Sequence, residues 1–282
     1  MAIERGASQT AVGVAMLRAA HMLLDGGPKI LHDPVTVRLL GPSVEAQLRE
    51  RAAYFADPGA RRIRVHVVLR SRFAEERFAQ AVARGATQMV QLGAGLDTFA
   101  YRQPSWSGGV RLFEVDHPAS QVAKRERLAA AGIALPQNLT YAPVDFEHET
   151  LDAGLARAGF DPAQVTFVSC LGVLVYLTME AIDGLFGWVA KLPGGSECAF
   201  TFGGTAGPDR PGAARIAARV AELGEPFRTP MELDDVRRVL AHAGLGEPEL
   251  PREAQVAGWM GQRMDGLEAP KRNRMAAVVV RG

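Results

Sequence analysis

The sequence predicts an α/β fold, in which helices cover both faces of a mostly parallel sheet and a helical extension precedes the sheet. The main observation is a change of pattern after residue 85, where short apolar runs begin to alternate with helix-like segments or turns. Such alternation is typical of parallel strands joined by crossover connections. A chain of 282 residues that is 48% hydrophobic and 22% charged can also bury a sizeable core.

Residues 1–85 are expected to form a helical N-terminal cap. Apolar side chains recur at helical spacing over residues 10–24, before a Gly-Gly-Pro stop. The stretch "DPVTVRLLG" predicts a short second helix, because Asp33 can cap it and proline suits its first position. A long third helix is expected over about residues 60–84.

Residues 86–282 are expected to form the sheet-bearing core, so that the chain is one structural domain overall. The expected strands are the apolar runs "TQMVQLG", "GVRLFEVD", "LTYAPVDF", "QVTFVSCLGV", "GSECAFTFGG" and the tail "RMAAVVVRG". Helices between them are indicated by "PASQVAKRERLAAAG", by "TMEAIDGLFGWVAKL" with Thr178 as its cap, and by "ELDDVRRVLAHAG". Residues 204–230, with a Gly- and Pro-rich start and a helix-like middle, are expected to be an inserted helical lid.

Composition narrows the classes of function. The formal net charge is +1, and no dense run of Lys and Arg suggests a nucleic-acid partner. The N-terminus lacks a secretory apolar run, and no charge-free apolar stretch is long enough for a membrane span. We therefore expect a cytoplasmic monomer or homodimer without a membrane partner. Cys170 and Cys198 lie in apolar runs, which favours buried free thiols over a disulfide.

The segment "QLGAGLDTFAYR" predicts a ligand-binding turn between the first strand and the next helix. Gly93, Ala94 and Gly95 leave room for a ligand to approach the backbone. A dinucleotide fingerprint would need glycine at position 98, which is Thr98 here, and Asp97 would repel phosphates at a helix N-terminus. A nicotinamide-dependent oxidoreductase is therefore disfavoured.

Asp97 instead favours a ligand with an ammonium group. A ribose, an adenine and an amino-acid tail without phosphate describe S-adenosylmethionine (SAM). The alternative is that Asp97 only caps the following helix.

Acidic residues also end the next two expected strands. Asp116, in "FEVDHP", could accept hydrogen bonds from both ribose hydroxyls, while Glu114 on the same face is expected to pair internally, with Arg102 as the suggested partner. In "APVDFE", Asp145 could accept from the adenine amino group and Phe146 could lie against the ring. Each acid alone is more often a cap or a solvated turn residue, but three acidic strand ends favour a nucleoside site.

With these residues in view, the chain resembles the SAM-dependent methyltransferases related to leucine carboxyl methyltransferases, especially their bacterial small-molecule branch. "LGAGLDTFAYR" repeats the loop of that branch, except for Phe99 in place of arginine. "EVDHP", "VDFE", "FVSCLGVLVYLTMEAI", "GEPFRT" and "RMDGL" are similar to its other segments, so the resemblance covers nearly the whole chain. It implies a class I methyltransferase fold, Rossmann-like with a seven-stranded sheet, and SAM as cofactor with S-adenosylhomocysteine (SAH) as product.

The resemblance also implies a role for one arginine. "LRSRF" is similar to the family's Arg-Thr-Arg-Phe segment, in which the first arginine holds the cofactor's carboxylate, and this corresponds to Arg70. Without the resemblance, Arg70 would read as a solvated helix residue. Ser169 and Cys170 stand where leucine carboxyl methyltransferases often carry a glutamate, which puts a protein substrate in doubt. The expected cofactor-binding residues are thus Arg70, Gly93, Ala94, Gly95, Asp97, Asp116, His117, Asp145, Phe146 and Ser169.

The acceptor side is less defined by the sequence. Tyr176 and His117 are the candidate catalytic residues, although Tyr176 could belong to the core and none of the six histidines has a catalytic spacing. No acidic cluster suggests a magnesium site, so metal-independent chemistry is expected. The prediction is an O-methyltransferase acting on a carboxylate or hydroxyl of a small, hydrophobic metabolite of natural-product type. The alternative is a SAM-binding protein that catalyses a rearrangement or acts as a sensor, and a peptide or protein carboxyl methyltransferase is less favoured.

Overall fold

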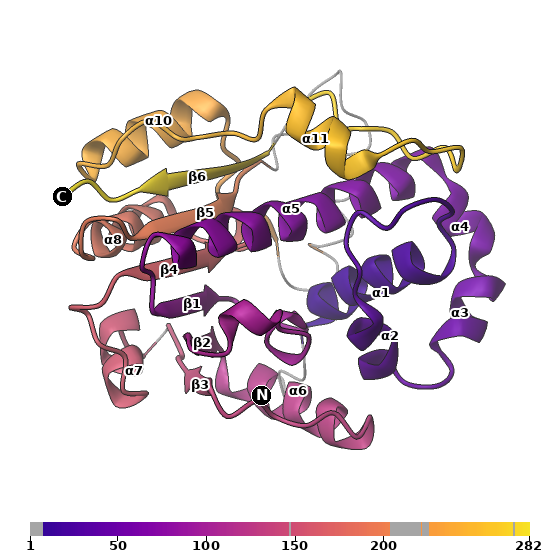
Figure 1. Ribbon diagram of the computed structural model, residues 1–282, viewed down its shortest axis with the longest axis horizontal. Coiled ribbons are helices and arrows are strands. Elements are labelled where there is room, and N and C mark those ends of the chain that lie inside the picture. The colour runs from indigo at the N-terminus through magenta and orange to yellow at the C-terminus, as the bar shows by residue number, and fades with distance from the viewer. Residues whose placement is uncertain (1–7, 147, 204–220, 222–225, 273) are drawn as a thin grey trace.

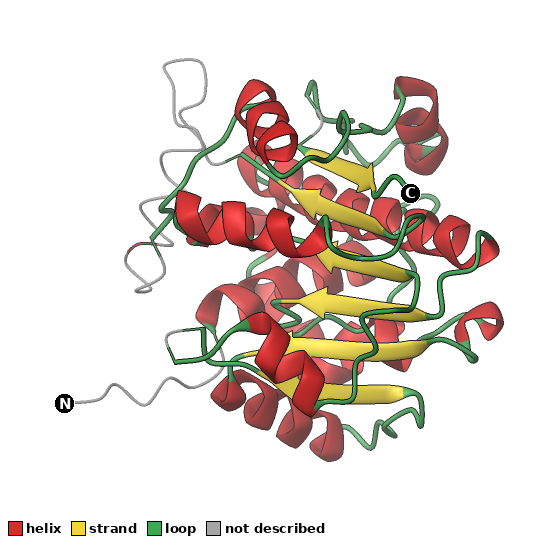
Figure 2. Ribbon diagram, turned by 90° about the vertical axis from the view of Figure 1, so that its left-hand side faces the viewer, coloured by secondary structure: helices red, strands yellow, loops and turns green. Residues whose placement is uncertain are grey.

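The computed structural model describes residues 8–146, 148–203, 221, 226–272 and 274–282, and its centre is a six-stranded sheet (Figures 1 and 2). The strand order is β3-β2-β1-β4-β5-β6, with β1 to β5 parallel and β6 antiparallel to β5. The strands are β1 (Gln88–Leu92), β2 (Arg111–Asp116), β3 (Leu139–Pro143), β4 (Thr166–Cys170), β5 (Glu197–Thr201) and β6 (Met275–Val279). All six match the apolar runs from which strands were predicted.

The described part of the chain contains six of the seven predicted strands. Beside β6, where a further strand would pair, there is only a single antiparallel bridge between Glu249 and Ala277. Pro248 and Pro251 flank this bridge. Because Pro251, two residues after Glu249, has no backbone N–H to donate to β6, the ladder cannot continue on that side.

The N-terminal cap is helical, as predicted, and contains more helices than the sequence indicated. Its elements are α1 (Gln9–Leu23), α2 (Pro34–Leu40), α3 (Val44–Glu50), α4 (Ala52–Ala56) and α5 (Pro58–Ala83). Asp33 caps α2 as expected, because its side chain accepts a hydrogen bond from the backbone N–H of Thr36. In Figure 1, the long helix α5 crosses the sheet and its first half extends beyond the carboxyl ends of β1 and β4, beside α1.

The remaining helices cover the sheet from both faces. They are α6 (Pro118–Ala130), α7 (Leu151–Arg157), α8 (Met179–Val189), α10 (Leu233–His242) and α11 (Glu253–Met260). Thr178 caps α8, as predicted, by accepting from the backbone N–H of Ala181. The predicted lid at 204–230 lies outside the described residues, except for position 221 and residues 226–230.

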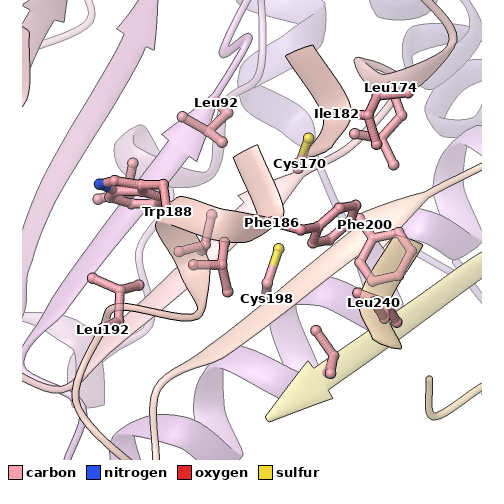
Figure 3. Packing of buried hydrophobic residues seen from close by; sticks show 14 of the residues in the cluster. Leu92, Cys170, Leu174, Ile182, Phe186, Trp188, Leu192, Cys198, Phe200 and Leu240 are labelled. Atoms are coloured by element: carbon pink, nitrogen blue, oxygen red, sulfur yellow. The ribbon is translucent and has the colours of Figure 1, made fainter. Parts of the chain in front are cut away.

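Two hydrophobic layers fill the spaces on either side of the sheet. On one side, Val90 and Leu92 pack with α8 and α10, and Figure 3 shows part of this cluster around Phe186 and Phe200. On the other side, Met89 packs with residues of α5. Alternate residues of β1 thus enter opposite layers, which is why the strand reads as a continuous apolar run.

The two cysteines belong to the first of these layers. Cys170 on β4 and Cys198 on β5 are free and fully buried, as predicted (Figure 3). Burial raises the pKa of the Cys170 thiol to about 12, and that of Cys198 is also raised well above its ordinary value. Both thiols are therefore protonated and act as small apolar side chains.

Phe99, which departs from the family's loop, belongs to the other layer. Its side chain is 3% exposed, and its ring meets that of Phe78 on α5 edge-on at a centroid distance of 5.5 Å. Packing against α5 therefore accounts for the aromatic residue. We expect Phe99→Leu to lower the free energy of unfolding by about 1–2 kcal/mol without changing ligand affinity. Urea unfolding and calorimetric binding of SAM check this, and a selective loss of SAM binding in a stable variant would contradict it.

Candidate functional site

A cavity of about 260 Å³ opens at the carboxyl ends of the central strands. Its walls come from the loop after β1, the ends of β2 and β4, the first half of α1 and the middle of α5. This is where ligands bind in open parallel sheets. The predicted site residues that line it are Arg70, Gly93, Ala94, Gly95, Asp97, Asp116, Ser169 and Tyr176.

The glycine loop needs its glycines for both conformation and space. Gly93 and Gly95 have φ angles of 60° and 45°, in the left-handed region. A Cβ on Gly93 would lie 2.6 Å from Cγ2 of Val173, and one on Gly95 would lie 3.2 Å from Cβ of Ala11 on α1. The loop therefore lies tightly between the fourth strand's exit and the N-terminal helix.

Replacing Gly93 with alanine tests this packing. Alanine would be held at a positive φ and would push against Val173, so we expect a loss of about 1–2 kcal/mol of stability together with weaker ligand binding. Thermal unfolding and SAM calorimetry measure the two effects. Gly184→Ala is the matched control, because a Cβ at Gly184 meets nothing within 4 Å. A Gly93 variant as stable and as active in binding as the control would refute the assignment.

Asp97 is bound to a partner within the chain that the sequence analysis did not find. Its Oδ2 lies 2.5 Å from Nη1 of Arg18, on α1, and its Oδ1 accepts the backbone N–H of Phe99 at 2.8 Å. Burial would raise the pKa of Asp97, but the charges of Arg18 and Arg102 outweigh it and hold that pKa well below the usual range. Asp97 is therefore ionised, and its hydrogen bond with the N–H of Phe99 lies at the start of the short turn Phe99–Tyr101.

Arg18, which also lines the cavity, is the centre of a buried polar network. It is 3% exposed, its Nε lies 2.9 Å from Oδ2 of Asp33, and its Nη2 donates to Thr98. Thr98 in turn donates to Asp33 at 2.8 Å, and Arg102 extends the network to Glu75. The network ties α1 and α2 to the glycine loop. No local sequence signal marked Arg18, because its partners are distant in the chain.

Glu114 does not pair with Arg102, so that suggestion was wrong. Its Oε2 lies 2.7 Å from Nζ of Lys124 on α6, and both side chains are fully buried. Arg102 binds Glu75 instead. The correction follows from the strand geometry: Glu114 points toward α6, whereas Arg102 lies on the α5 side of the loop.

Asp116 supports the loop from the end of β2. Its Oδ2 accepts the backbone N–H of Gly95 at 2.6 Å, and its Oδ1 accepts that of His117 at 2.7 Å. The carboxylate also lines the cavity. Each oxygen keeps a second lone pair that can accept from a ligand hydroxyl.

Three predicted residues lie outside the lining of the cavity. His117 caps α6, because its Nδ1 accepts the N–H of Ala119, while its Nε2 lies 3.6 Å from Oδ2 of Asp145. Asp145 also contacts His148 at 3.0 Å, and Phe146 is 58% exposed. These residues follow the ends of β2 and β3, which are neighbours there because Asp116 pairs with Pro143. His117 serves here as a helix cap rather than as a cavity residue.

Arg70 differs from Arg18 because it has no partner within the described part of the chain. It makes no hydrogen bond or ion pair there, and its Nη1 lies 2.7 Å from where a Cβ on Gly172 would be. Gly172 has a φ of 75°, so glycine is needed there both for this backbone conformation and to leave room for the Arg70 guanidinium. Burial and the charge of Arg18 lower the pKa of Arg70 to about 10. A cation therefore faces the cavity and is free to bind an anion.

Ser169 and Tyr176 define the side of the cavity near β4. Ser169 is buried at the strand's end, and Tyr176 closes the short turn Leu174–Tyr176. The Tyr176 ring meets that of Phe227 edge-on at 5.5 Å. Within the described ranges, no group of three or more His, Cys, Asp or Glu side chains is placed to hold a metal ion, and no helix is long and apolar enough to cross a membrane.

Comparison with known proteins assigns the chain to a family. The model of the leucine carboxyl methyltransferase family matches residues 11–190. The chain belongs to this family. A Mycolicibacterium smegmatis relative, named "Putative S-adenosyl-L-methionine-dependent methyltransferase", is 32% identical over 97% of this chain and 86% of its own length. A Bacillus subtilis relative with the same description is 34% identical over 62% of this chain and 59% of its own length.

Solved structures show the same fold. A Streptomyces avermitilis protein superimposes with a TM-score of 0.58 at 18% identity, covering 97% of this chain and 98% of the other. A Thermobifida fusca protein also gives a TM-score of 0.58 at 18% identity, covering 98% and 96%. The fold is therefore that of the class I methyltransferases, and the chain is a SAM-dependent methyltransferase of the leucine carboxyl methyltransferase family.

Proposed function

We propose that this methyltransferase binds the amino-acid tail of SAM between Arg70 and Asp97 and transfers the methyl group to a carboxylate or hydroxyl oxygen of a small, hydrophobic metabolite. The unpartnered guanidinium of Arg70 is the observation that carries the proposal. A partly buried cation without a partner is costly to keep, which favours a ligand carboxylate at that place. Asp97, on the opposite side of the same cavity, supplies the acceptor for the ammonium group.

The ammonium would share Asp97 with Arg18. Of the two carboxylate oxygens, Oδ1 already accepts from Phe99 and Oδ2 from Arg18, yet each has a further acceptor position, and the side chain is 16% exposed. With Arg18, Arg70, Asp97 and Asp116 at its walls, the cavity carries two charges of each sign. This balance suits a zwitterionic tail.

The remaining parts of the cofactor follow the strand ends. Asp116, held by the N–H of Gly95, is proposed to accept from the ribose hydroxyls. Beyond the rim, Asp145 and Phe146 are the proposed adenine contacts, with His117 beside them. The exposed Phe146 ring gains a partner if adenine stacks on it.

The chemistry is a displacement at the methyl carbon. The cofactor's sulfonium supplies the electrophile, so the chain's task is to orient the acceptor and exclude water. Tyr176 and Ser169 lie at the side of the cavity next to β4, and Tyr176 together with Phe227 provides an apolar wall. We propose that the acceptor lies against this wall, with the Tyr176 hydroxyl orienting its oxygen and helices α1 to α5 acting as the cap.

A labelling experiment tests the proposal. The protein is incubated with methyl-labelled SAM and a small-molecule extract of its own host, and products are found by mass spectrometry. A labelled methyl ester or ether of a low-molecular-weight compound, formed together with SAH, is expected. Label found only in protein would contradict the small-molecule acceptor, and conversion of SAM without any methylated product would contradict methyl transfer itself.

A further inference from the structure

The guanidinium group of Arg70 lies against a backbone turn that requires glycine. The turn follows β4 at Gly172, whose φ is 75°. A Cβ on Gly172 would lie 2.7 Å from Nη1 of Arg70 and 3.2 Å from both its Cζ and its Nη2. Because all three atoms belong to the planar guanidinium, the whole group lies against the Gly172 backbone. The position of this cation in the cavity therefore depends on where the turn is held.

A side chain of the neighbouring strand holds this turn. The backbone N–H of Gly172 donates to Oγ1 of Thr201 at 2.6 Å. Thr201 is the last residue of β5 and is 4% exposed. The regular pairing of β4 with β5 ends at Cys170 and Phe200, so the Thr201 hydroxyl continues the connection by one side-chain hydrogen bond beyond the ladder. Removing this oxygen would leave the N–H of Gly172 without its acceptor.

Thr201 lies on the face of the sheet that α5 covers. Side chains alternate along a strand, so Glu197, Ala199 and Thr201 share one face of β5. Glu197 forms an ion pair with Arg77 of α5, and Ala199 belongs to the hydrophobic layer that contains residues of α5. The helix therefore follows this row of side chains, with Arg77 near the amino end of β5 and Arg70 at the cavity, near the carboxyl end.

We propose that Thr201 is a positioning residue for the cofactor, which acts on the SAM carboxylate through Gly172 and Arg70. The inference rests on the proposed function, because the carboxylate is that of the SAM tail. Thr201 is not one of the described residues that line the cavity, so it acts only through the turn that it holds. A guanidinium that is already ordered loses less conformational freedom when the carboxylate binds, which raises the affinity.

The test measures the tail preference of the full chain, defined as the Kd of 5′-methylthioadenosine divided by the Kd of SAH. Both compounds contain the adenosine part, but only SAH carries the amino-acid tail. We expect Thr201→Val, which keeps the side-chain shape and removes the acceptor oxygen, to lower this ratio by roughly 2- to 10-fold in calorimetry. Thr201→Ser, which keeps the oxygen, should retain the native ratio. An equal loss in both variants, or no loss in Thr201→Val, would overturn the inference.

A matched control separates this effect from a general loss of stability. Thr166, the first residue of β4, is also buried, and its hydroxyl donates to the carbonyl oxygen of Gln164 at 2.9 Å. It lies at the amino end of the strand, away from the cavity. Thr166→Val should lower the free energy of unfolding in urea, as Thr201→Val does, yet leave the tail preference unchanged. A ratio lowered equally by both variants would contradict a specific role for Thr201.

Combined variants test whether Thr201 acts through Arg70. In the Arg70→Met background, Thr201→Val should lower the tail preference no further, because the guanidinium that it positions is gone. A further loss there would mean another route and would overturn the inference.

Gly172→Ala tests the same contact from the other side, and it also serves if Thr201→Val does not fold. Its Cβ would displace the guanidinium, so the tail preference should fall about as far as in Arg70→Met. If the ratio falls in Arg70→Met but is native in Gly172→Ala or in Thr201→Val, this inference is overturned and the proposed function stands. If Arg70→Met itself keeps the native ratio, both are overturned.

Discussion

Arg18→Met is expected to lower the free energy of unfolding by about 3–5 kcal/mol at pH 7, because it removes the cation in closest contact with the buried Asp33 and the largely buried Asp97, which then keep only the more distant Arg102. SAM binding should be lost as well, since Asp97 would no longer be held in place against the glycine loop. Urea unfolding measures the first effect and calorimetry the second. Arg62→Met is a suitable control, because Arg62 is an exposed residue of α5.

The effect of Arg18→Met on the free energy of unfolding should depend on pH. In the folded protein the pKa of Asp97 lies below its ordinary value of 3.8. Its ion pair with Arg18 therefore contributes stability above about pH 3.8, and this contribution is lost as the pH falls through the folded-state pKa. The stability difference between the native chain and Arg18→Met should be largest near neutral pH and smaller at pH 4, because the mutant's buried carboxylate can then take up a proton. A difference that grows on acidification would contradict the ion pair.

Arg70→Met is expected to weaken SAM binding strongly and to leave the free energy of unfolding unchanged, whereas Arg18→Met lowers both. Arg70 has no hydrogen bond or ion pair among the described residues, so its loss leaves no buried group unpaired. If Arg70 holds the cofactor's carboxylate, the variant loses a charge-assisted hydrogen bond worth about 1.5–3 kcal/mol, or roughly 10- to 150-fold in Kd. Calorimetry with SAM and urea unfolding separate the two quantities.

Comparison of the two arginines makes this prediction specific. Arg18→Met should weaken both folding and binding, whereas Arg70→Met should weaken binding alone. Arg62→Met, on the same helix as Arg70, should change neither. If Arg70→Met proves as unstable as Arg18→Met, the Arg70 side chain has a structural partner and cannot be reserved for a ligand.

The sequence predicted the parts of this protein that depend on local pattern. Each apolar run became a strand, and the caps Asp33 and Thr178 were located correctly, because period and capping are properties of neighbouring residues. The glycine loop and Asp97 were also found in this way. Arg70 was different, since only the resemblance to a family distinguished it from a solvated helix residue.

The features that were missed depend on contacts between distant segments. Arg18 meets Asp97 across 79 positions of sequence, so no local spacing indicates that pair. Glu114 was assigned the wrong partner because the choice between Arg102 and Lys124 depends on which side of the sheet each one approaches. The seventh strand was expected from the family, whereas the described residues beside β6 pair at a single bridge, which Pro251 cannot extend.

The central claim is that the cavity binds the amino-acid tail of SAM through Arg70 and Asp97. Calorimetric titration with SAM and with 5′-methylthioadenosine, which lacks that tail, tests it most directly. We expect SAM to bind more tightly than 5′-methylthioadenosine, and Arg70→Met to reduce this preference by roughly 10- to 150-fold, since Asp97 still faces the ammonium group. Equal affinity for the two compounds, or a preference that is unchanged in Arg70→Met, would contradict the account.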